Sequence, residues 1–78
     1  MTKLEKFLSK LTKKKRPVIE HTIMRIVQND LKGLDVKKLK NIDYLYRVRK
    51  GGIRIIFSLE NNVANIIEIC WRNDNTYK

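Results

Sequence analysis

Cysteine, proline, histidine and glycine are scarce in this chain of 78 residues, which contains one, one, one and three of them respectively. A single cysteine excludes an internal disulfide framework, which is typical of a reducing cytoplasm. No apolar run reaches membrane-spanning length, and the N-terminus lacks the uncharged apolar segment of a secretory signal. We therefore expect one cytoplasmic domain, residues 1–78, with no membrane partner.

Acidic residues are also few. Eight Asp and Glu stand against 18 Lys and Arg, which gives a formal net charge of +10 and a pI near 10.1. This balance favours a polyanionic partner, either nucleic acid or an acidic protein. His21 and Cys70 have no other ligand at metal-binding spacing, and no glycine-rich loop precedes a helix, so we expect neither a metal nor a cofactor.

The most regular pattern lies in residues 43–72, where three alternating apolar runs are separated by turn signals at Gly51-Gly52 and at residues 60–62. Such alternation is typical of half-buried strands joined as hairpins. A two-residue glycine turn fixes the register of the first hairpin. The expected pairs are Arg49 with Arg54, Val48 with Ile55, Arg47 with Ile56, and Tyr46 with Phe57.

For the second turn the pattern favours an odd-numbered loop, because a two-residue Asn61-Asn62 turn would bury Glu68 and Arg72. This register sets Glu68 opposite Arg54 and Asn65 opposite Phe57. The residues expected on the core face are Leu59, Val63, Ile67, Ile69 and Trp71. Those expected on the other face are Ala64, Ile66, Glu68, Cys70 and Arg72.

Four arginines are expected on the face opposite the core: Arg47, Arg49, Arg54 and Arg72. Arg47 and Arg49 would lie about 6.6 Å apart at about 3.3 Å per residue, a separation comparable with the repeat of an extended nucleic-acid backbone. Facing cations repel each other, and a multivalent anion would relieve that repulsion. A solvated basic surface is the alternative, but the number of arginines favours phosphate binding.

Two amphipathic helices are expected before the strands, at residues 3–15 and at about 17–29, with a connecting segment at 34–42. Packed antiparallel on one face of the sheet, they predict an α+β fold. Their apolar stripes are Leu4, Phe7, Leu8 and Leu11, then Ile19, Ile23, Ile26 and Val27. Four cations precede Pro17 and form either a solvated corner or a second phosphate contact: Lys13, Lys14, Lys15 and Arg16.

The run LKGLDVKKLKNIDYLYRVRKGGIRIIF, the strand ending in Trp71-Arg72, and Tyr77 together resemble the RelE/ParE toxin superfamily of bacterial and archaeal toxin–antitoxin modules. The resemblance covers nearly the whole chain. It implies a RelE-like fold, although the usual first strand is missing, because Met1-Thr2-Lys3 lead directly into the first helix. We therefore expect either a sheet of only three strands with one edge open or a first strand that has been trimmed from this sequence.

The resemblance to the RelE branch implies a type II toxin that cleaves mRNA in the ribosomal A site, by attack of the 2′-OH on the adjacent phosphate. On this view Arg54 and Arg72 stabilise the developing charge, Tyr77 stacks on a base or orients the sugar, and Arg47 and Arg49 grip the backbone. The catalytic residues implied are Arg47, Arg49, Arg54, Arg72 and Tyr77. The further RNA-binding residues expected are Lys50, Lys13, Lys14, Lys15 and Arg16.

One departure from the family concerns proton transfer. RelE has lysines at the positions of Arg47 and Arg49, and arginine is a poor general base. Proton removal then falls to a ribosomal group, to water or to Lys50. The partners implied are the ribosome, mRNA and an acidic antitoxin. The alternatives are a ParE-like inhibitor of DNA gyrase and an inactive basic nucleic-acid-binding module.

Overall fold

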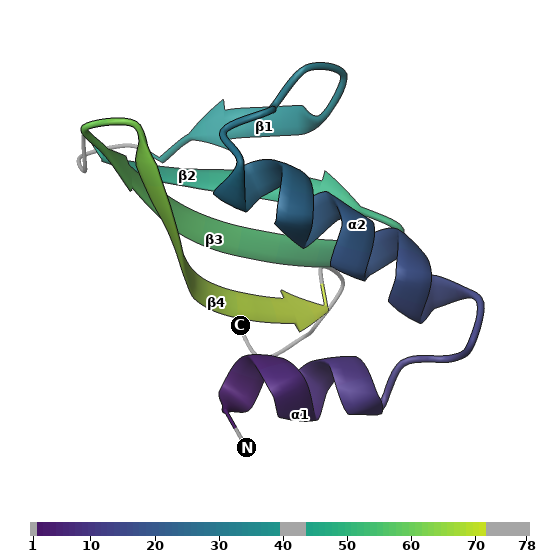
Figure 1. Ribbon diagram of the computed structural model, residues 1–78. Coiled ribbons are helices and arrows are strands. Elements are labelled where there is room, and N and C mark those ends of the chain that lie inside the picture. The colour runs from purple at the N-terminus through teal and green to yellow at the C-terminus, as the bar shows by residue number, and fades with distance from the viewer. Residues whose placement is uncertain (1, 40–43, 72–78) are drawn as a thin grey trace.

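The computed structural model describes residues 2–39 and 44–71, and these form two helices followed by one antiparallel sheet (Figure 1). The helices are α1 (Lys3–Ser9) and α2 (Lys15–Val27). The strands are β1 (Asp35–Lys38), β2 (Leu45–Lys50), β3 (Ile53–Glu60) and β4 (Val63–Trp71), in the spatial order β1-β2-β3-β4. The predicted α+β class, with two helices before a meander, is confirmed.

Helix α1 begins with a capping box. Glu5 N donates to Thr2 Oγ1 at 3.1 Å, and Thr2 N donates to Glu5 Oε1 at 2.9 Å. The bond from the Thr2 backbone N–H is the main reason that the pKa of Glu5 lies below its ordinary value. The helix ends at Ser9, not at residue 15 as expected, because Thr12 Oγ1 accepts a bond from Lys15 N and starts a new turn.

Helix α2 packs through Ile19 and Ile26, which are buried, and through Ile23, which is partly buried. Thr22 is also buried, and its hydroxyl donates to Val18 O at 2.9 Å, so its polar group is satisfied. Val27 was expected on this stripe but is exposed, since the next residue after Ile26 is rotated by about 100° around a helix of 3.6 residues per turn.

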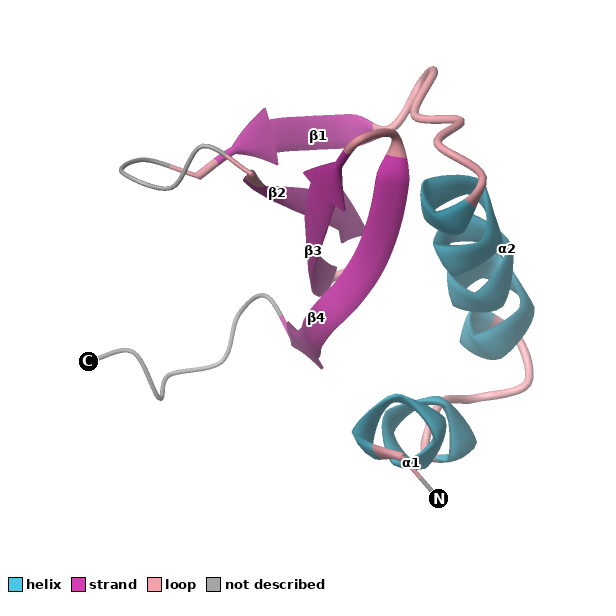
Figure 2. Ribbon diagram, turned by 60° about the vertical axis from the view of Figure 1, so that its left-hand side comes forward, coloured by secondary structure: helices cyan, strands magenta, loops and turns pink. Residues whose placement is uncertain are grey.

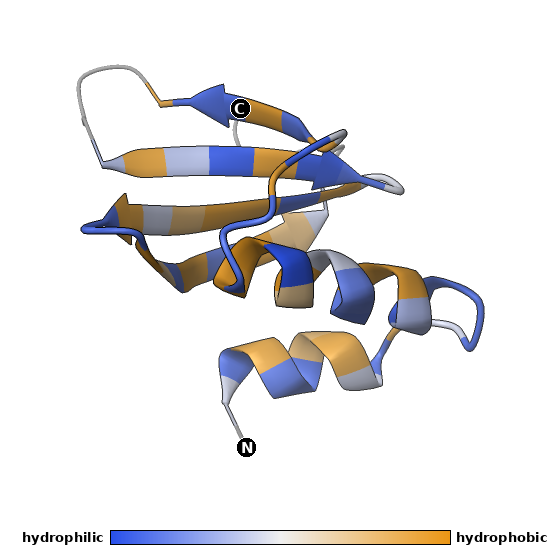
Figure 3. Ribbon diagram, turned by 45° about the horizontal axis from the view of Figure 1, so that its top comes forward, coloured by the Kyte–Doolittle hydropathy of each residue, from blue (hydrophilic) through white to orange (hydrophobic). Residues whose placement is uncertain are grey.

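Both helices lie on the same side of the sheet, as Figure 2 shows, and both contact β4. The core lies between the helices and this face, and Tyr46 stacks on Phe57 with a centroid distance of 5.6 Å. Hydrophilic and hydrophobic residues follow one another along β1 and β2 in Figure 3, as expected for strands with only one apolar face. The buried apolar residues are Ile19, Ile26, Val48, Ile53, Ile55, Phe57 and Ala64.

The hairpin between β2 and β3 has the predicted register, with Arg49 opposite Arg54 and Tyr46 opposite Phe57. Gly51 and Gly52 connect the strands at φ of 56° and 80°. Two successive positive φ values match the tight turn that suits the twist of a hairpin.

The predicted register of the second hairpin is wrong. Asn61 and Asn62 both adopt positive φ and form a two-residue turn, which pairs Glu60 with Val63. A β-bulge then inserts Ile67, since Phe57 pairs with Ile66 whereas Ile56 pairs with Glu68.

The bulge reverses the alternation of β4 at its midpoint. Ala64 is buried and Ile66 packs on the core, whereas Val63 and Ile67 are exposed, contrary to expectation. Beyond the bulge Glu68 returns to the face away from the helices, so the two-residue turn does not bury it. Cys70, rather than Glu68, lies opposite Arg54, and Ser58, rather than Phe57, lies opposite Asn65.

Strand β1 was not predicted. This segment was expected to be a connection, and the sheet was expected to have three strands, whereas the described sheet has four. β1 pairs antiparallel with β2, setting Asp35 opposite Arg49 and Lys37 opposite Arg47. Its pattern is weak: Val36 is its only apolar residue, and lysine is a poor strand former.

Candidate anion-binding site

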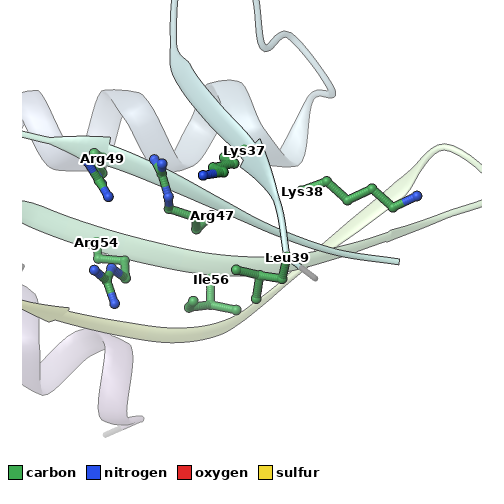
Figure 4. Close-up of a pocket in the computed structure, with 7 residues that line it drawn as sticks. All are labelled: Lys37, Lys38, Leu39, Arg47, Arg49, Arg54 and Ile56. Atoms are coloured by element: carbon green, nitrogen blue, oxygen red, sulfur yellow. The ribbon is translucent and has the colours of Figure 1, made fainter. Parts of the chain in front are cut away.

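The face of the sheet opposite the helices carries Arg47 and Arg49 on β2 and Arg54 on β3, and we call it the arginine face. Because side chains alternate along a strand, all three arginines lie on this side of the sheet. The direct pairing of Arg49 with Arg54 makes these two side chains neighbours across β2 and β3. The arginines surround a pocket of about 250 Å³ (Figure 4). Its lining residues are Lys37, Lys38, Leu39, Arg47, Arg49, Arg54 and Ile56.

Arg47 lies deepest on the arginine face and is only 8% exposed. Its Nη1 atom lies 3.6 Å from Asp35 Oδ1 on β1, an ion pair longer than a hydrogen bond, and the Asp35 side chain is 62% exposed. The same Nη1 atom is shielded from solvent and has no hydrogen-bond partner among the described residues. A buried charge with one loose counter-ion can gain from an anion that enters the pocket.

Arg49 and Arg54 lie directly across the β2–β3 ladder and are half-buried, and the Nε atom of each is shielded from solvent. Residues so paired have Cα atoms about 4.5–5.5 Å apart, so the two cations repel each other across the ladder. Glu68 was expected to offset this charge from the opposite position, but the bulge sets it beside Ile56 instead. Among the described residues that line the pocket, five are cations and none is an acid.

This arrangement suits phosphate. A guanidinium presents a planar set of donors that matches two phosphate oxygens, and packing on a sheet reduces the entropy lost when it binds. At about 250 Å³ the pocket is smaller than the roughly 300–1,000 Å³ typical of drug-sized ligands, so it suits a phosphate group better than a whole cofactor.

The other basic residues singled out in the sequence lie away from the pocket lining. Lys13 and Lys14 are exposed before α2, and Arg16 forms an exposed ion pair with Glu20 at 3.0 Å. Lys15 Nζ donates to Gly51 O at 3.0 Å and lies 5.5 Å from the centroid of the Trp71 ring. Lys15 therefore links the start of α2 to the β2–β3 turn through this hydrogen bond.

The sequence also predicted site roles for Lys50, Arg72 and Tyr77. Lys50 is exposed at the end of β2, and it pairs with the buried Ile53 on the face that carries the helices. Arg72 and Tyr77 lie outside the described residues. The structure thus brings together Arg47, Arg49 and Arg54 from the predicted set.

Two pocket-lining lysines were missed by the sequence reasoning, Lys37 and Lys38. The available signal was the alternation of Leu34, Val36 and charged residues, but it includes too few apolar side chains to identify a strand without its partner β2. The counter-ion Asp35 was missed for the same reason.

Other chemistry has little support in the described part of the chain. His21 is exposed on α2, and Cys70 is a half-buried free thiol on β4. Over residues 2–39 and 44–71, His, Cys, Asp and Glu form no group that could hold a metal ion. Neither described helix is long and apolar enough to cross a membrane.

No family model, curated protein or solved structure matches this chain. Its function is therefore inferred from the arginine face and from the motif resemblance.

Proposed function

We propose that the arginine face binds the phosphate backbone of RNA, and that the protein is a RelE-like toxin that cleaves mRNA on the ribosome. The observation that carries this proposal is the convergence of Arg47, Arg49 and Arg54 on one pocket, where none of the described lining residues is an acid. The resemblance of YRVR, the glycine turn and RIIF to the RelE branch supports it, because these motifs contain the same three arginines.

RNA suits this site better than DNA because its 2′-OH can act as the nucleophile. The 2′ oxygen attacks the adjacent phosphorus, and the bond from phosphorus to the 5′ oxygen breaks. The products are a 2′,3′-cyclic phosphate and a 5′-OH end. Arg54 stabilises the charge that develops on the non-bridging oxygens, while Arg47 and Arg49 hold the backbone. The resemblance implies that Arg72 is a second donor that stabilises this charge. It also implies that Tyr77 contacts a base or the sugar.

Proton transfer needs a group other than these arginines, because a guanidinium stays protonated. Lys50 lies on the opposite face of β2 from Arg49, so it is poorly directed toward a phosphate on the arginine face. We assign removal of the 2′-OH proton, and delivery of a proton to the departing 5′ oxygen, to water or to ribosomal groups. A ribosomal group in this role would make the ribosome part of the catalytic site. An acidic antitoxin would be the natural inhibitor of a cationic face.

The test is primer extension on an mRNA in a reconstituted translation system, with and without ribosomes. Arg54→Ala should lower the cleavage rate by about 10²–10³, the usual effect of removing one donor to a developing oxyanion. Lys6→Ala, which removes an exposed cation from α1, should leave the rate unchanged and is the matched control. Arg72→Ala tests the role that the resemblance implies.

Cleavage that requires both ribosomes and Arg54 would support the proposal. Intact mRNA in the presence of folded protein would refute it. A supercoiling assay with DNA gyrase, run in parallel, would then identify the ParE-like alternative, which does not need the arginine pocket.

A further inference from the structure

The pairing of β1 with β2 brings a second cation pair to the arginine face. Lys37 lies opposite Arg47 on these neighbouring strands, while Arg49 lies opposite Arg54 across β2 and β3. Arg47 and Arg49 are two residues apart on β2, so the two pairs are consecutive steps along one strand. Each pair combines one residue of β2 with one residue of a flanking strand.

We infer that these pairs form two phosphate subsites, Lys37 with Arg47 and Arg49 with Arg54, which bind two successive phosphates of one extended strand. This inference rests on the proposed phosphate binding and adds to it the role of Lys37 and the number of phosphates bound. The two subsites lie about 6.6 Å apart at about 3.3 Å per residue. That separation is comparable with the phosphate repeat of an extended nucleic-acid backbone.

Burial gives the two members of the first subsite different roles. Arg47 is 8% exposed and fixed in orientation, whereas Lys37 is exposed on the edge strand and can follow a phosphate as it enters. A planar, fixed donor paired with a mobile point charge suits an anion whose position varies slightly between sequences. In Figure 4 the Lys37 side chain lies beside the Arg47 guanidinium, while the Lys38 side chain extends away from the arginines.

Asp35 on β1 is the acidic residue that contacts this first subsite. It lies opposite Arg49 in the register, and its carboxylate is 3.6 Å from Arg47 Nη1. Because the Asp35 side chain is mostly in water, it can move aside when a phosphate takes its place. The Asp35 carboxylate thus competes with the first phosphate for Arg47.

The test compares a dinucleoside monophosphate with a trinucleoside diphosphate, both with 2′-O-methyl sugars so that neither can be cleaved. Affinities are measured by NMR titration of the wild-type protein, Lys37→Gln and Lys6→Gln, after circular dichroism has shown that each is folded. The wild type should bind the trinucleotide about tenfold more tightly, as one extra charge-assisted contact implies. Lys37→Gln should reduce this ratio to about twofold or less, the level of a statistical preference alone.

Lys6→Gln is the matched control, since it removes the same charge from an exposed residue of α1 that does not line the pocket, and it should keep the tenfold ratio. Equal binding of the two ligands by the wild type, or equal effects of the two substitutions, would overturn the two-subsite inference while leaving phosphate binding intact. Failure of the folded wild type to bind either ligand would overturn phosphate binding itself. The two failures are therefore distinguishable.

Discussion

Replacing Arg47 by methionine should separate the stability of this fold from its capacity to bind phosphate. Arg47 is 8% exposed, and its Nη1 atom forms an ion pair with Asp35 Oδ1 at 3.6 Å. Because the Asp35 side chain is 62% exposed, the attraction is near the water limit of about 1 kcal/mol. Removing a guanidinium from water costs several kcal/mol, so the charge of Arg47 opposes folding on balance.

Methionine keeps an unbranched apolar stem in the same position, and Asp35 is left in solvent rather than buried without a partner. We expect Arg47→Met to leave the free energy of unfolding unchanged or to raise it by up to about 2 kcal/mol. For a domain of this size each 1 kcal/mol shifts Tm by about 4–8 °C. The same variant should lose most of its affinity for the trinucleoside diphosphate.

Urea denaturation followed by circular dichroism gives the stability, at low and at high salt. Salt screens the repulsion among the cations of the arginine face, so it should stabilise the wild type more than Arg47→Met. Arg25→Met is the control, because Arg25 pairs with Asp30 at 3.3 Å and donates to Lys32 O, away from the pocket. A loss of more than about 2 kcal/mol in Arg47→Met would refute the reasoning and assign Arg47 to the support of β1.

Two further predictions concern carboxylates. Asp35→Asn removes the internal counter-ion of Arg47 and should raise affinity for the trinucleoside diphosphate by up to about fivefold, while Asp30→Asn should not; an equal or weaker affinity in NMR titration would contradict this. The bonds from Thr2 hold the pKa of Glu5 below its ordinary value of 4.5, so Glu5 stabilises the fold above that pH and loses this effect as pH falls through its lower folded value. The gap in Tm between wild type and Glu5→Ala should therefore close on acidification, and a gap that stays constant in thermal unfolding would argue against the capping box.

Much of the arginine face could be predicted from the sequence because its determinants are local. Gly51-Gly52 specify a two-residue turn, and that turn fixes the pairing of Arg49 with Arg54 whatever the rest of the chain does. A period of two along each strand then sets Val48, Ile55 and the arginines on opposite faces. The RelE-like assignment and the roles of Arg72 and Tyr77 stay predictions.

The second hairpin could not be predicted by the same reasoning. Alternation favoured an odd loop, but Asn61 and Asn62 tolerate positive φ, and a bulge at Ile67 keeps Glu68 away from the core. A bulge has no sequence signature of its own here. It is decided by packing, since Ala64 and Ile66 reach the core on one side of it and Ile69 on the other.

The sequence by itself determined the helices, the first hairpin, the excess of cations and the side of β2 on which the arginines lie. Tertiary structure alone decided that Asp35–Lys38 is a strand, because a segment with one apolar residue becomes extended only when the free edge of β2 supplies its hydrogen bonds. That pairing brings Lys37 and Asp35, which belong to the preceding strand, to Arg47. The two phosphate subsites that we infer therefore depend on a contact that local pattern does not encode.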